Sequence, residues 1–513
     1  MKVAFLGLGP SNVECYGIRI LSSCVRQRGH ETVVYFVHVQ PGRSLAPEQV
    51  INLSQELARF DVIGLSVMSP FLNAAIDITQ QLKSMYSKPI VWGGIHPTVD
   101  PKGSLAFADI VSVGESENSF PELLEKLERK EDWSQTRGIH FMRDGKYVDN
   151  GASPLVQDLD TLPFADIDWR RFFLVDDATI IPFTEKLYEV KSGKTYGTFP
   201  TRGCPYKCSY CTNSFLNSLY PGQKPVRKRS AENVIQELEV MTRALPFMHA
   251  IKFDDDAFFV QKDDEIERFA EIYKARVGMR IFVCGATPAT LSKRKLDALV
   301  GCNIITIRMG IQSFSNNARK IYNRPHTSQR ILSAANLLAQ YADRFVLPPR
   351  YDIILDNPWE TEEDVVETIK CLAQIKPPYK LSVFSLRIFP GTDLYDDAVR
   401  EGLLPADLDL AAQWGDYHKL QETYVNQLVY TLSWVARFGF VIPTWYVNLM
   451  CSKFVRSASP WLGQALIKII YWACALYRFG GSARVHFNEA LGDLRKGETG
   501  RIRRFIWRFF VKS

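Results

Sequence analysis

The chain has 513 residues, of which 46% are hydrophobic and 23% are charged, and its formal net charge is +6. This composition is that of ordinary globular domains and excludes a chain that is disordered throughout. A net charge this small gives no indication of nucleic-acid binding, and the length is enough for about two to four domains.

Residues 1–130 alternate between segments typical of strands and segments typical of helices. Five short apolar segments separated mainly by helices predict an α/β unit with a doubly wound, Rossmann-like parallel sheet. Such a sheet binds its ligand beyond the carboxyl ends of its strands. The expected strands are 2–8, 32–37, 62–67, 90–92 and 110–113. The expected helices are 12–29, 47–59, 72–85 and 119–130.

A connection is expected over residues 131–195. Asp144 and Gly145 stand between the short apolar segments 139–141 and 147–148, and this pair is a hairpin turn signal. A stretch rich in Pro and Asp follows at 158–169. The sequence therefore predicts a linker with a hairpin between two domains.

Strand and helix segments alternate again over residues 196–404. Six strands in succession, with helices between them, predict a partial (β/α)6 barrel of the TIM type, whose chemistry lies at the carboxyl ends of the strands. The expected strands are 197–201, 250–253, 281–284, 304–311, 350–355 and 381–388. The expected helices include 231–242, 263–276, 328–341 and 361–375. Residues 405–513 are expected to form a mainly helical region.

Three cysteines, Cys204, Cys208 and Cys211, lie within eight residues, directly after the first expected barrel strand. Thiolates this close can hold one metal centre. Structural zinc normally takes four ligands, whereas a 4Fe-4S cluster takes one thiolate per iron, so that three thiolates leave one iron open. Both centres remain possible on spacing alone. The other seven cysteines are scattered, and we expect them to be packing residues in a reducing compartment.

The cysteine spacing, with the aromatic Tyr210 before the third cysteine, resembles the signature of the radical S-adenosylmethionine (SAM) enzymes. Further segments typical of that family follow in order, so that the resemblance covers about residues 198–400. They are IKFDDDAFF at 251–259, MGIQSFS at 309–315, YDIILDNPWETEEDVVETI at 351–369 and RIFPGT at 387–392. The resemblance implies a 4Fe-4S cluster on the three cysteines, SAM on the open iron and Tyr210 near the adenine. With it, zinc has little support.

The same resemblance implies further contacts to SAM. Gln312 and Ser313 occupy the fourth-strand position that commonly contacts SAM, although many relatives have Glu in place of Gln312. The second-strand segment usually contacts the SAM amino group, and Asp254 and Asp255 are the candidates, with Asp256 beside them. A solvated turn or a helix cap is the alternative for each of these aspartates.

Three loops of the first unit follow its third, fourth and fifth strands, where a doubly wound sheet binds its ligand. Their sequences resemble the cobalamin-binding domains that precede certain radical SAM domains. The implied cobalamin contacts are Ser66, Met68, Gly93, Gly94, His96, Gly114 and Glu115.

The resemblance is incomplete, because the first loop reads GPSNVECYG and lacks the Asp-x-His-x-x-Gly element that supplies a lower axial histidine in other cobalamin proteins. Many cobalamin-dependent radical SAM enzymes lack it too. We expect His96 to have a turn or cofactor-edge role in preference to binding cobalt. A degenerate domain that binds nothing is the alternative for the whole region.

The resemblance as a whole implies a cobalamin-dependent radical SAM enzyme of the class B methyltransferase type. Such an enzyme forms a 5′-deoxyadenosyl radical and methylates an unactivated carbon, here of a secondary-metabolite or lipid-like small molecule. It takes its electron from an external flavodoxin or ferredoxin. A cyclase or rearrangement enzyme is the alternative, and a cobalamin-dependent sensor or electron-transfer module has less support. A methylthiotransferase normally has a further N-terminal cysteine cluster, which is not found here. No motif identifies a catalytic residue or the substrate.

The C-terminal tail, residues 495–513, carries seven Lys or Arg against one Glu, interleaved with Phe, Ile and Trp. Such a stretch lies at an anionic membrane surface or docks as a helix on the barrel, and the sequence favours neither. No segment of about 18 residues is both apolar and free of charge. We expect a cytoplasmic protein with no nucleic-acid partner and, through this tail, an optional peripheral membrane contact.

Overall fold

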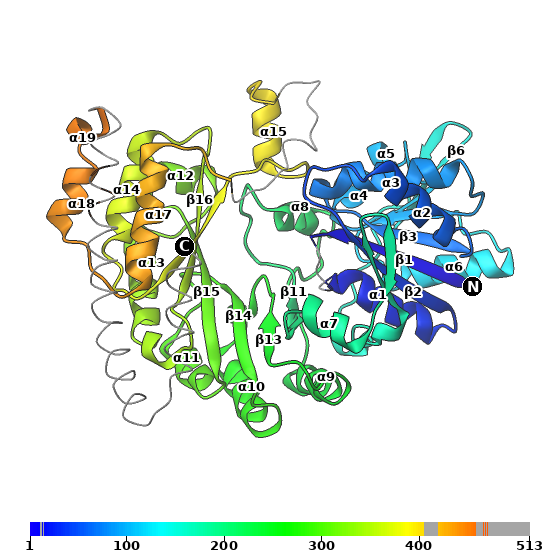
Figure 1. The fold of residues 1–513 in the computed structure, drawn as a ribbon, viewed down its shortest axis with the longest axis horizontal. Coiled ribbons are helices and arrows are strands. Elements are labelled where there is room, and N and C mark those ends of the chain that lie inside the picture. Colours follow the sequence, from blue (N-terminus) through cyan, green and yellow to red (C-terminus); the bar gives the residue numbers. More distant parts are fainter. Residues whose placement is uncertain are drawn as a thin grey trace, which may run out of the picture.

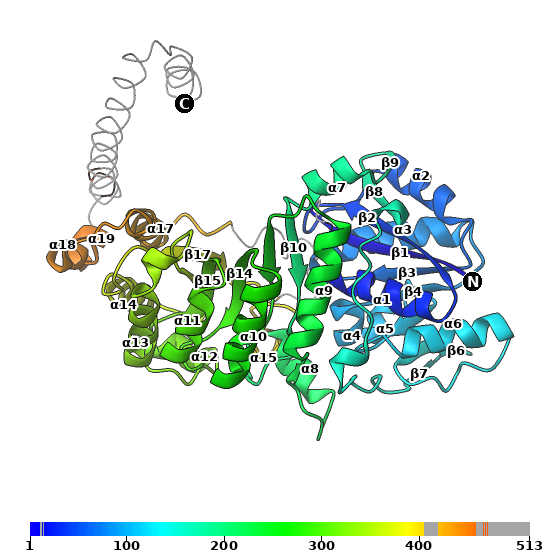
Figure 2. The ribbon, with the colours of Figure 1, turned by 90° about the horizontal axis from the view of Figure 1, so that it is seen from below.

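The computed structural model describes residues 1–10, 13, 15–404 and 419–457, together with 465, 467 and 469. It contains two large sheets with helices packed on them, and the two units lie side by side (Figure 1). Seen from below, α8 and α9 of the second unit lie near the boundary with the first (Figure 2). The expected α/β architecture, a doubly wound sheet followed by a partial barrel, is confirmed.

The first sheet has nine strands in the order β7-β6-β5-β4-β3-β1-β2-β8-β9. Strands β5, β4, β3, β1 and β2 run parallel. They are short apolar runs that are buried on both faces, as central parallel strands are. The strand order reverses between β1 and β3, which places the ligand-binding edge at the carboxyl ends of these strands. The nine strands are β1 (Lys2–Gly9), β2 (Glu31–His38), β3 (Val62–Ser66), β4 (Ile90–Gly93), β5 (Ile110–Ser112), β6 (Ile139–Arg143), β7 (Lys146–Val148), β8 (Phe172–Asp176) and β9 (Thr179–Pro182).

Helices cover both faces of this sheet. Val3 and Phe5 of β1 share a hydrophobic core with α1 and α6, while Ala4 and Leu6 share the other core with α2 and α3. This follows from the alternation of side chains along a strand. The helices of the first unit are α1 (Tyr16–Gln27), α2 (Pro47–Leu57), α3 (Leu72–Lys83), α4 (Ile95–Val99), α5 (Pro101–Ser104), α6 (Ser119–Arg129) and α7 (Glu185–Lys191).

Residues 131–195 differ from the expected linker, because they extend both edges of the first sheet. Strands β6 and β7 continue it antiparallel beyond β5, and β8 pairs parallel with β2 before β9 turns back. The hairpin turn lies at Asp144 and Gly145 as expected, and both have positive φ. The pairing of β8 with β2 joins segments more than 130 residues apart, and no local pattern specifies such a partner.

The second sheet has six parallel strands that follow one another in sequence order, and β10 and β17 are its unpaired edges among the described residues. It is therefore an open barrel. Its strands are β10 (Thr195–Thr198), β13 (Ala250–Phe253), β14 (Arg280–Ala286), β15 (Ile304–Gln312), β16 (Arg350–Leu355) and β17 (Lys380–Ser385); β11 (Thr201–Arg202) and β12 (Arg227–Lys228) form a small separate ladder. Its helices are α8 (Thr212–Ser218), α9 (Ala231–Ala244), α10 (Asp263–Arg276), α11 (Lys293–Val300), α12 (Asn316–Ile321), α13 (Ser328–Ala339), α14 (Glu362–Leu372) and α15 (Asp393–Arg400).

Three further helices follow the barrel: α17 (Tyr424–Arg437), α18 (Thr444–Met450) and α19 (Lys453–Ser457). Helix α17 covers the edge of β17, where the Leu381 N–H donates to Ser433 Oγ over 3.0 Å. The basic tail at 495–513 lies outside the described residues. No helix in the described part of the chain is both long and apolar enough to span a membrane.

Candidate cofactor site between the two sheets

The three cysteines lie on the loop that follows β10, the first strand of the barrel, and α8 begins directly after Cys211. Cys208 is buried, and Cys204 and Cys211 are partly buried. The loop starts with Gly203, whose φ of +85° favours glycine and where an added Cβ would lie 1.9 Å from the Pro225 carbonyl oxygen. The fold thus carries all three thiols on one tight loop at the carboxyl end of a barrel strand.

The thiols are close enough to affect one another. Burial raises the pKa of Cys204 to about 11 and that of Cys211 to about 12, and Cys208 contributes to both shifts. In the described residues, no group of three His, Cys, Asp or Glu side chains is arranged to hold a single ion. An iron–sulfur cluster makes no such demand, because each of its irons takes its own thiolate. The three sulfur donors fit a 4Fe-4S cluster, and Cys204, Cys208 and Cys211 would hold it.

Arg324 connects this loop to the barrel. Its Nη1 donates to Cys208 Sγ over 3.6 Å and to the Tyr210 hydroxyl over 3.2 Å, and its Nη2 donates to the Gly310 carbonyl over 2.8 Å. The ring of Tyr210 packs edge-on against Tyr322, with the centroids 5.1 Å apart. Arg324 has no place in the sequence signature, because it lies more than 100 residues after the cysteines.

The acidic run after β13 divides into three different environments. Asp255 is buried and accepts hydrogen bonds from the Thr201 amide and hydroxyl, both over 2.6 Å, and from the Ala257 amide. Burial raises its pKa to about 6. Asp254 pairs with Lys252 over 2.8 Å, and Asp256 accepts from Asn213 over 3.1 Å. Asp255 therefore holds the start of the cysteine loop, and its oxygens are already used.

The two fourth-strand candidates point in different directions. Gln312 lies at an irregularity in the β15–β16 register with a φ of +71°, and it lines a cavity of about 250 Å³ together with Tyr210. Ser313 is buried outside that cavity, and its hydroxyl lies 3.0 Å from the Thr368 hydroxyl and donates to Glu360 over 3.3 Å. The structure brings Gln312 and Tyr210 together and places Ser313 behind them.

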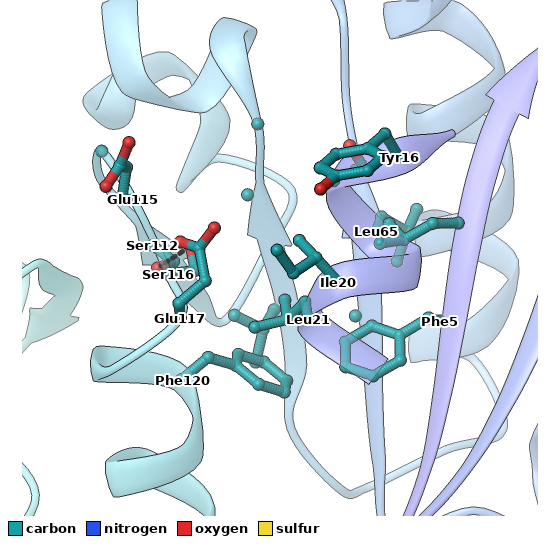
Figure 3. Close-up of a pocket in the computed structure, with 18 of the residues that line it drawn as sticks. Phe5, Tyr16, Ile20, Leu21, Leu65, Ser112, Glu115, Ser116, Glu117 and Phe120 are labelled. Carbon is teal, nitrogen blue, oxygen red and sulfur yellow. Dashed lines mark hydrogen bonds between the residues drawn. The ribbon is translucent and has the colours of Figure 1, made fainter. Parts of the chain in front are cut away.

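The first unit has a cavity of about 300 Å³ between its sheet and the helices α1 and α6 (Figure 3). Its wall is mainly apolar, with Phe5, Ile20, Leu21 and Phe120 on it, while Ser112 and Glu115 are among its polar groups (Figure 3). Five of the residues expected at cobalamin line this cavity, namely Ser66, Gly93, Gly94, Gly114 and Glu115.

A second cavity, of about 330 Å³, lies between the first sheet and the cysteine loop, where Gly203 lines it. The two cavities share residues from both units, namely Gly94, Gly114, Glu115, Phe199 and Arg202. Gly94 and Gly114 have φ of +96° and +85°, and a Cβ on Gly114 would lie 2.1 Å from the Tyr220 hydroxyl. Two adjoining, mainly apolar cavities with glycines at their shared edge fit a corrinoid, and these residues would hold it.

Two expected cobalamin contacts lie outside both cavities. The His96 side chain is buried, with Nδ1 3.1 Å from Ser69 Oγ, and burial lowers its pKa. Met68 is 43% exposed. Neither residue lines the cavity walls. The placement of His96 supports a structural role in its turn in preference to cobalt ligation.

Glu115 also connects the two units. Its two carboxylate oxygens accept from Arg227 over 2.6 and 2.8 Å, and Arg202 lies 3.4 Å away and pairs with Glu117 over 2.6 Å. Burial opposes the charge of Glu115, but the hydrogen bonds from Arg227 and the nearby guanidinium groups hold its pKa below the ordinary value. Arg202 and Arg227 come from the small ladder of β11 and β12, and no sequence signal identified them.

Comparison with known proteins gives matches for both units. Residues 198–372 match the radical SAM superfamily, and residues 10–124 match the B12 binding domain, so the two matches together cover more than half of the chain. An uncharacterized methyltransferase of Pyrococcus horikoshii is 25% identical over 362 residues, which are 70% of this chain and 72% of that protein. The bacteriochlorophyllide d C-8(2)-methyltransferase of Chlorobaculum tepidum is 21% identical over 378 residues, with the same two shares.

A solved structure has the same arrangement of units. It is the radical SAM methyltransferase TsrM from Kitasatospora setae with cobalamin and a 4Fe-4S cluster bound, and it aligns with a TM-score of 0.59 at 15% identity over 82% of each chain. At this identity the likeness concerns the fold. With both domain matches and the cysteine loop facing the corrinoid-type cavity, the chain belongs to the cobalamin-dependent radical SAM enzymes.

Proposed function

We propose that this enzyme transfers a methyl group to an unactivated carbon of a small molecule, and that the transfer takes place between the two sheets. One observation carries the proposal: residues beside the cysteine loop, Phe199 and Arg202, line the same cavities as Gly94 and Gly114 of the first unit. When bound, the cluster with SAM supplies a radical, and cobalamin supplies the methyl group. Both groups would then face one space.

The protein's own residues have positioning roles in this proposal. Arg324 fixes Cys208 and Tyr210 relative to β15, and Asp255 fixes the backbone at Thr201, in the short strand β11 just before the cysteine loop. Gln312 and Tyr210 face the barrel cavity and are the proposed SAM contacts. Asp254 and Ser313 are proposed to act behind them, since each is already bonded to a neighbour.

The cluster assignment is tested by replacing Cys208 with Ala in anaerobically reconstituted enzyme. The expected result is loss of 5′-deoxyadenosine formation from SAM, because a thiolate ligand is missing. Cys371→Ala is the matched control, since Cys371 is a partly buried thiol on α14, far from the loop in sequence, and it should leave the rate unchanged. Formation of 5′-deoxyadenosine by the Cys208 variant would refute the assignment.

Product mass separates methylation from the alternatives. A methyltransferase adds one carbon to its substrate, whereas a cyclase or rearrangement enzyme leaves the carbon count unchanged. A sensor or electron-transfer module would cleave no SAM.

The proposal includes an external one-electron donor of the flavodoxin or ferredoxin type. Reduced flavodoxin or reduced ferredoxin should therefore support 5′-deoxyadenosine formation. Failure with both proteins would contradict an electron donor of this type.

We also propose a peripheral membrane contact at the C-terminal end. The helices that follow α17 expose large apolar side chains to solvent: Trp445 is 67% exposed and Phe454 is 74% exposed. The sequence of the tail at 495–513 adds basic and aromatic residues. The test compares three proteins for their binding to anionic liposomes: the full chain, a truncation before Arg501 and the Trp445→Glu/Phe454→Glu double variant. Both changes should weaken binding, and equal binding by all three would contradict the contact.

A further inference from the structure

The inner face of the barrel carries a row of three cations at one level. In the parallel register, Arg308 of β15 is opposite Arg350 of β16, and Arg350 is opposite Lys380 of β17. Register partners on adjacent strands lie about 4.8 Å apart and point to the same face. The face is the inner one, because Arg308 lines the barrel cavity and the alternate residues of β16, such as Tyr351, lie in the outer core. We name these three residues the cationic row.

Among the described residues, one acidic side chain, Asp352, forms an ion pair with the cationic row; it pairs with Arg308, and its charge also acts on Arg350. Arg308 Nε donates to both oxygens of Asp352, over 2.7 and 2.8 Å. In the part of the chain that is described, no acidic side chain forms an ion pair with Arg350 or with Lys380, and both are partly buried. Burial lowers the pKa of each, and the charges of Arg308 and Arg437 lower that of Arg350 further. The row thus holds a local surplus of positive charge.

Two buried polar atoms, one in the row and one next to it, have no hydrogen-bond partner among the described residues. Arg350 Nε and Ser382 Oγ are both buried and without a hydrogen bond to any described residue. Ser382 lies two residues after Lys380 on the same face of β17, and its register partner is Asp352. A buried donor without an acceptor is destabilising. A ligand with acceptor oxygens at this point would satisfy both donors.

One member of the row, Arg308, lines the barrel cavity, which also has Tyr210 of the cysteine loop on its wall. The cavity of about 250 Å³ is bounded by Arg308 and Asp352 as well as by Gln312 and Tyr210. Aromatic rings flank the cations, since the Arg308 guanidinium lies 5.4 Å from the ring centre of Phe384, and that of Arg350 lies 5.7 Å from the ring centre of Phe282. A charged group here would be partly shielded from water, which strengthens its attraction to the cations.

We propose that the cationic row, with Ser382, binds an anionic group of the substrate, either a carboxylate or a phosphate. The rest of the substrate would extend from the row towards the end of the cavity at which Gln312 and Tyr210 are the proposed SAM contacts, and this assignment rests on the proposed function. Arg350 and Lys380 are the first residues of their strands, whereas SAM is expected at the carboxyl ends, where barrel chemistry lies. The row is therefore too deep in the barrel for the SAM carboxylate.

The test is calorimetric titration of the reconstituted holoenzyme with inorganic phosphate and, separately, with acetate. At least one of them should bind saturably to the unaltered protein, and the tighter anion identifies the group. Arg350→Gln should weaken that binding at least 10-fold and Ser382→Ala about 3-fold. Arg344→Gln is the matched control, since Arg344 is an exposed arginine in the loop before β16, and its affinity should change less than 2-fold.

The inference is overturned if neither anion binds, if Arg350→Gln and Ser382→Ala both bind as tightly as the unaltered protein, or if SAM competes with the anion. Should Arg350→Gln fail to fold, Ser382→Ala alone decides. The titration needs no turnover, so failure of the anion site leaves 5′-deoxyadenosine formation intact. Failure of the proposed function would instead appear as a product with no added carbon, or as no cleavage of SAM, while anion binding persists.

Discussion

Gly203 is the residue on which the shape of the cysteine loop most directly depends. An alanine there would have an unfavourable φ and a Cβ 1.9 Å from the Pro225 carbonyl oxygen. We expect Gly203→Ala to lower the free energy of unfolding by about 2–4 kcal/mol, as measured by chemical denaturation. Gly222 has a φ of +78° with nothing near its Cβ position, so Gly222→Ala should cost only about 1 kcal/mol. Equal losses would mean that the Pro225 contact is unimportant.

Glu360 gives the stability a dependence on pH. Burial raises the pKa of its carboxyl to about 7, above the ordinary value of 4.5. The folded state therefore binds the proton more tightly than the unfolded state, and stability falls as pH rises from about 4.5 to about 7. We expect Glu360→Gln to gain up to about 3 kcal/mol at pH 8 and nothing at pH 4, by chemical denaturation at each pH.

Glu363 provides the contrast for this prediction. It is an exposed neighbour whose pKa is lowered by its hydrogen bond with Arg456. The sign of its contribution is opposite, because the ionised form is favoured in the folded state. Glu363→Gln should therefore give no gain at pH 8. A gain of the same size in both variants would show that burial of Glu360 is not the cause.

At the scale of elements, α17 protects an edge of the barrel sheet. The hydroxyl of Ser433 accepts from the Leu381 amide, which has no strand partner on that side. Ser433→Ala would leave this amide unpaired, and we expect a loss of about 1–2 kcal/mol. Hydrogen exchange at Leu381 should accelerate. Ser452→Ala removes a hydroxyl that donates to the Leu449 carbonyl and accepts from the Val455 amide, both away from β17, and unchanged exchange at Leu381 is expected there. The same rate in both variants would contradict the covering role.

At the scale of the whole molecule, the ion pair between Glu115 and Arg227 joins the first unit to the barrel. Glu115→Gln and Arg227→Gln should each destabilise the protein by about 3 kcal/mol, because each removes one side of a buried, doubly hydrogen-bonded ion pair. The double variant should lose less than the sum, with a coupling of about 1–3 kcal/mol in a double-mutant cycle. The exposed pair Arg268–Glu232 is the control, and its coupling should be below about 1 kcal/mol. Additive losses at Glu115 and Arg227 would contradict the link between the units.

The sequence alone determined those features that depend on short stretches of chain. The period of apolar residues gave the strands and helices of both units, including α10 at Asp263–Arg276 with its bounds as expected. The cysteine spacing depends on one loop, and together with the family-like segments that follow it in order it pointed to the cluster. The glycines after β4 and β5 predicted the edge at which the first cavity lies. In each case the physical cause, turn geometry or side-chain periodicity, acts between neighbours in the sequence.

Only the tertiary structure decided what depends on partners far apart in the chain. Residues 131–195 form strands at the edges of the first sheet, and one of these, β8, pairs with the distant strand β2. Glu115 links the two units because Arg227, more than 100 residues later in the chain, donates hydrogen bonds to it. His96 and Ser313, expected from the sequence as cofactor contacts, do not line the cavities at which the other expected contacts lie. Arg308, Arg350 and Lys380 form a row only through strand register. Such pairings depend on packing over the whole molecule, and local sequence patterns therefore do not predict them.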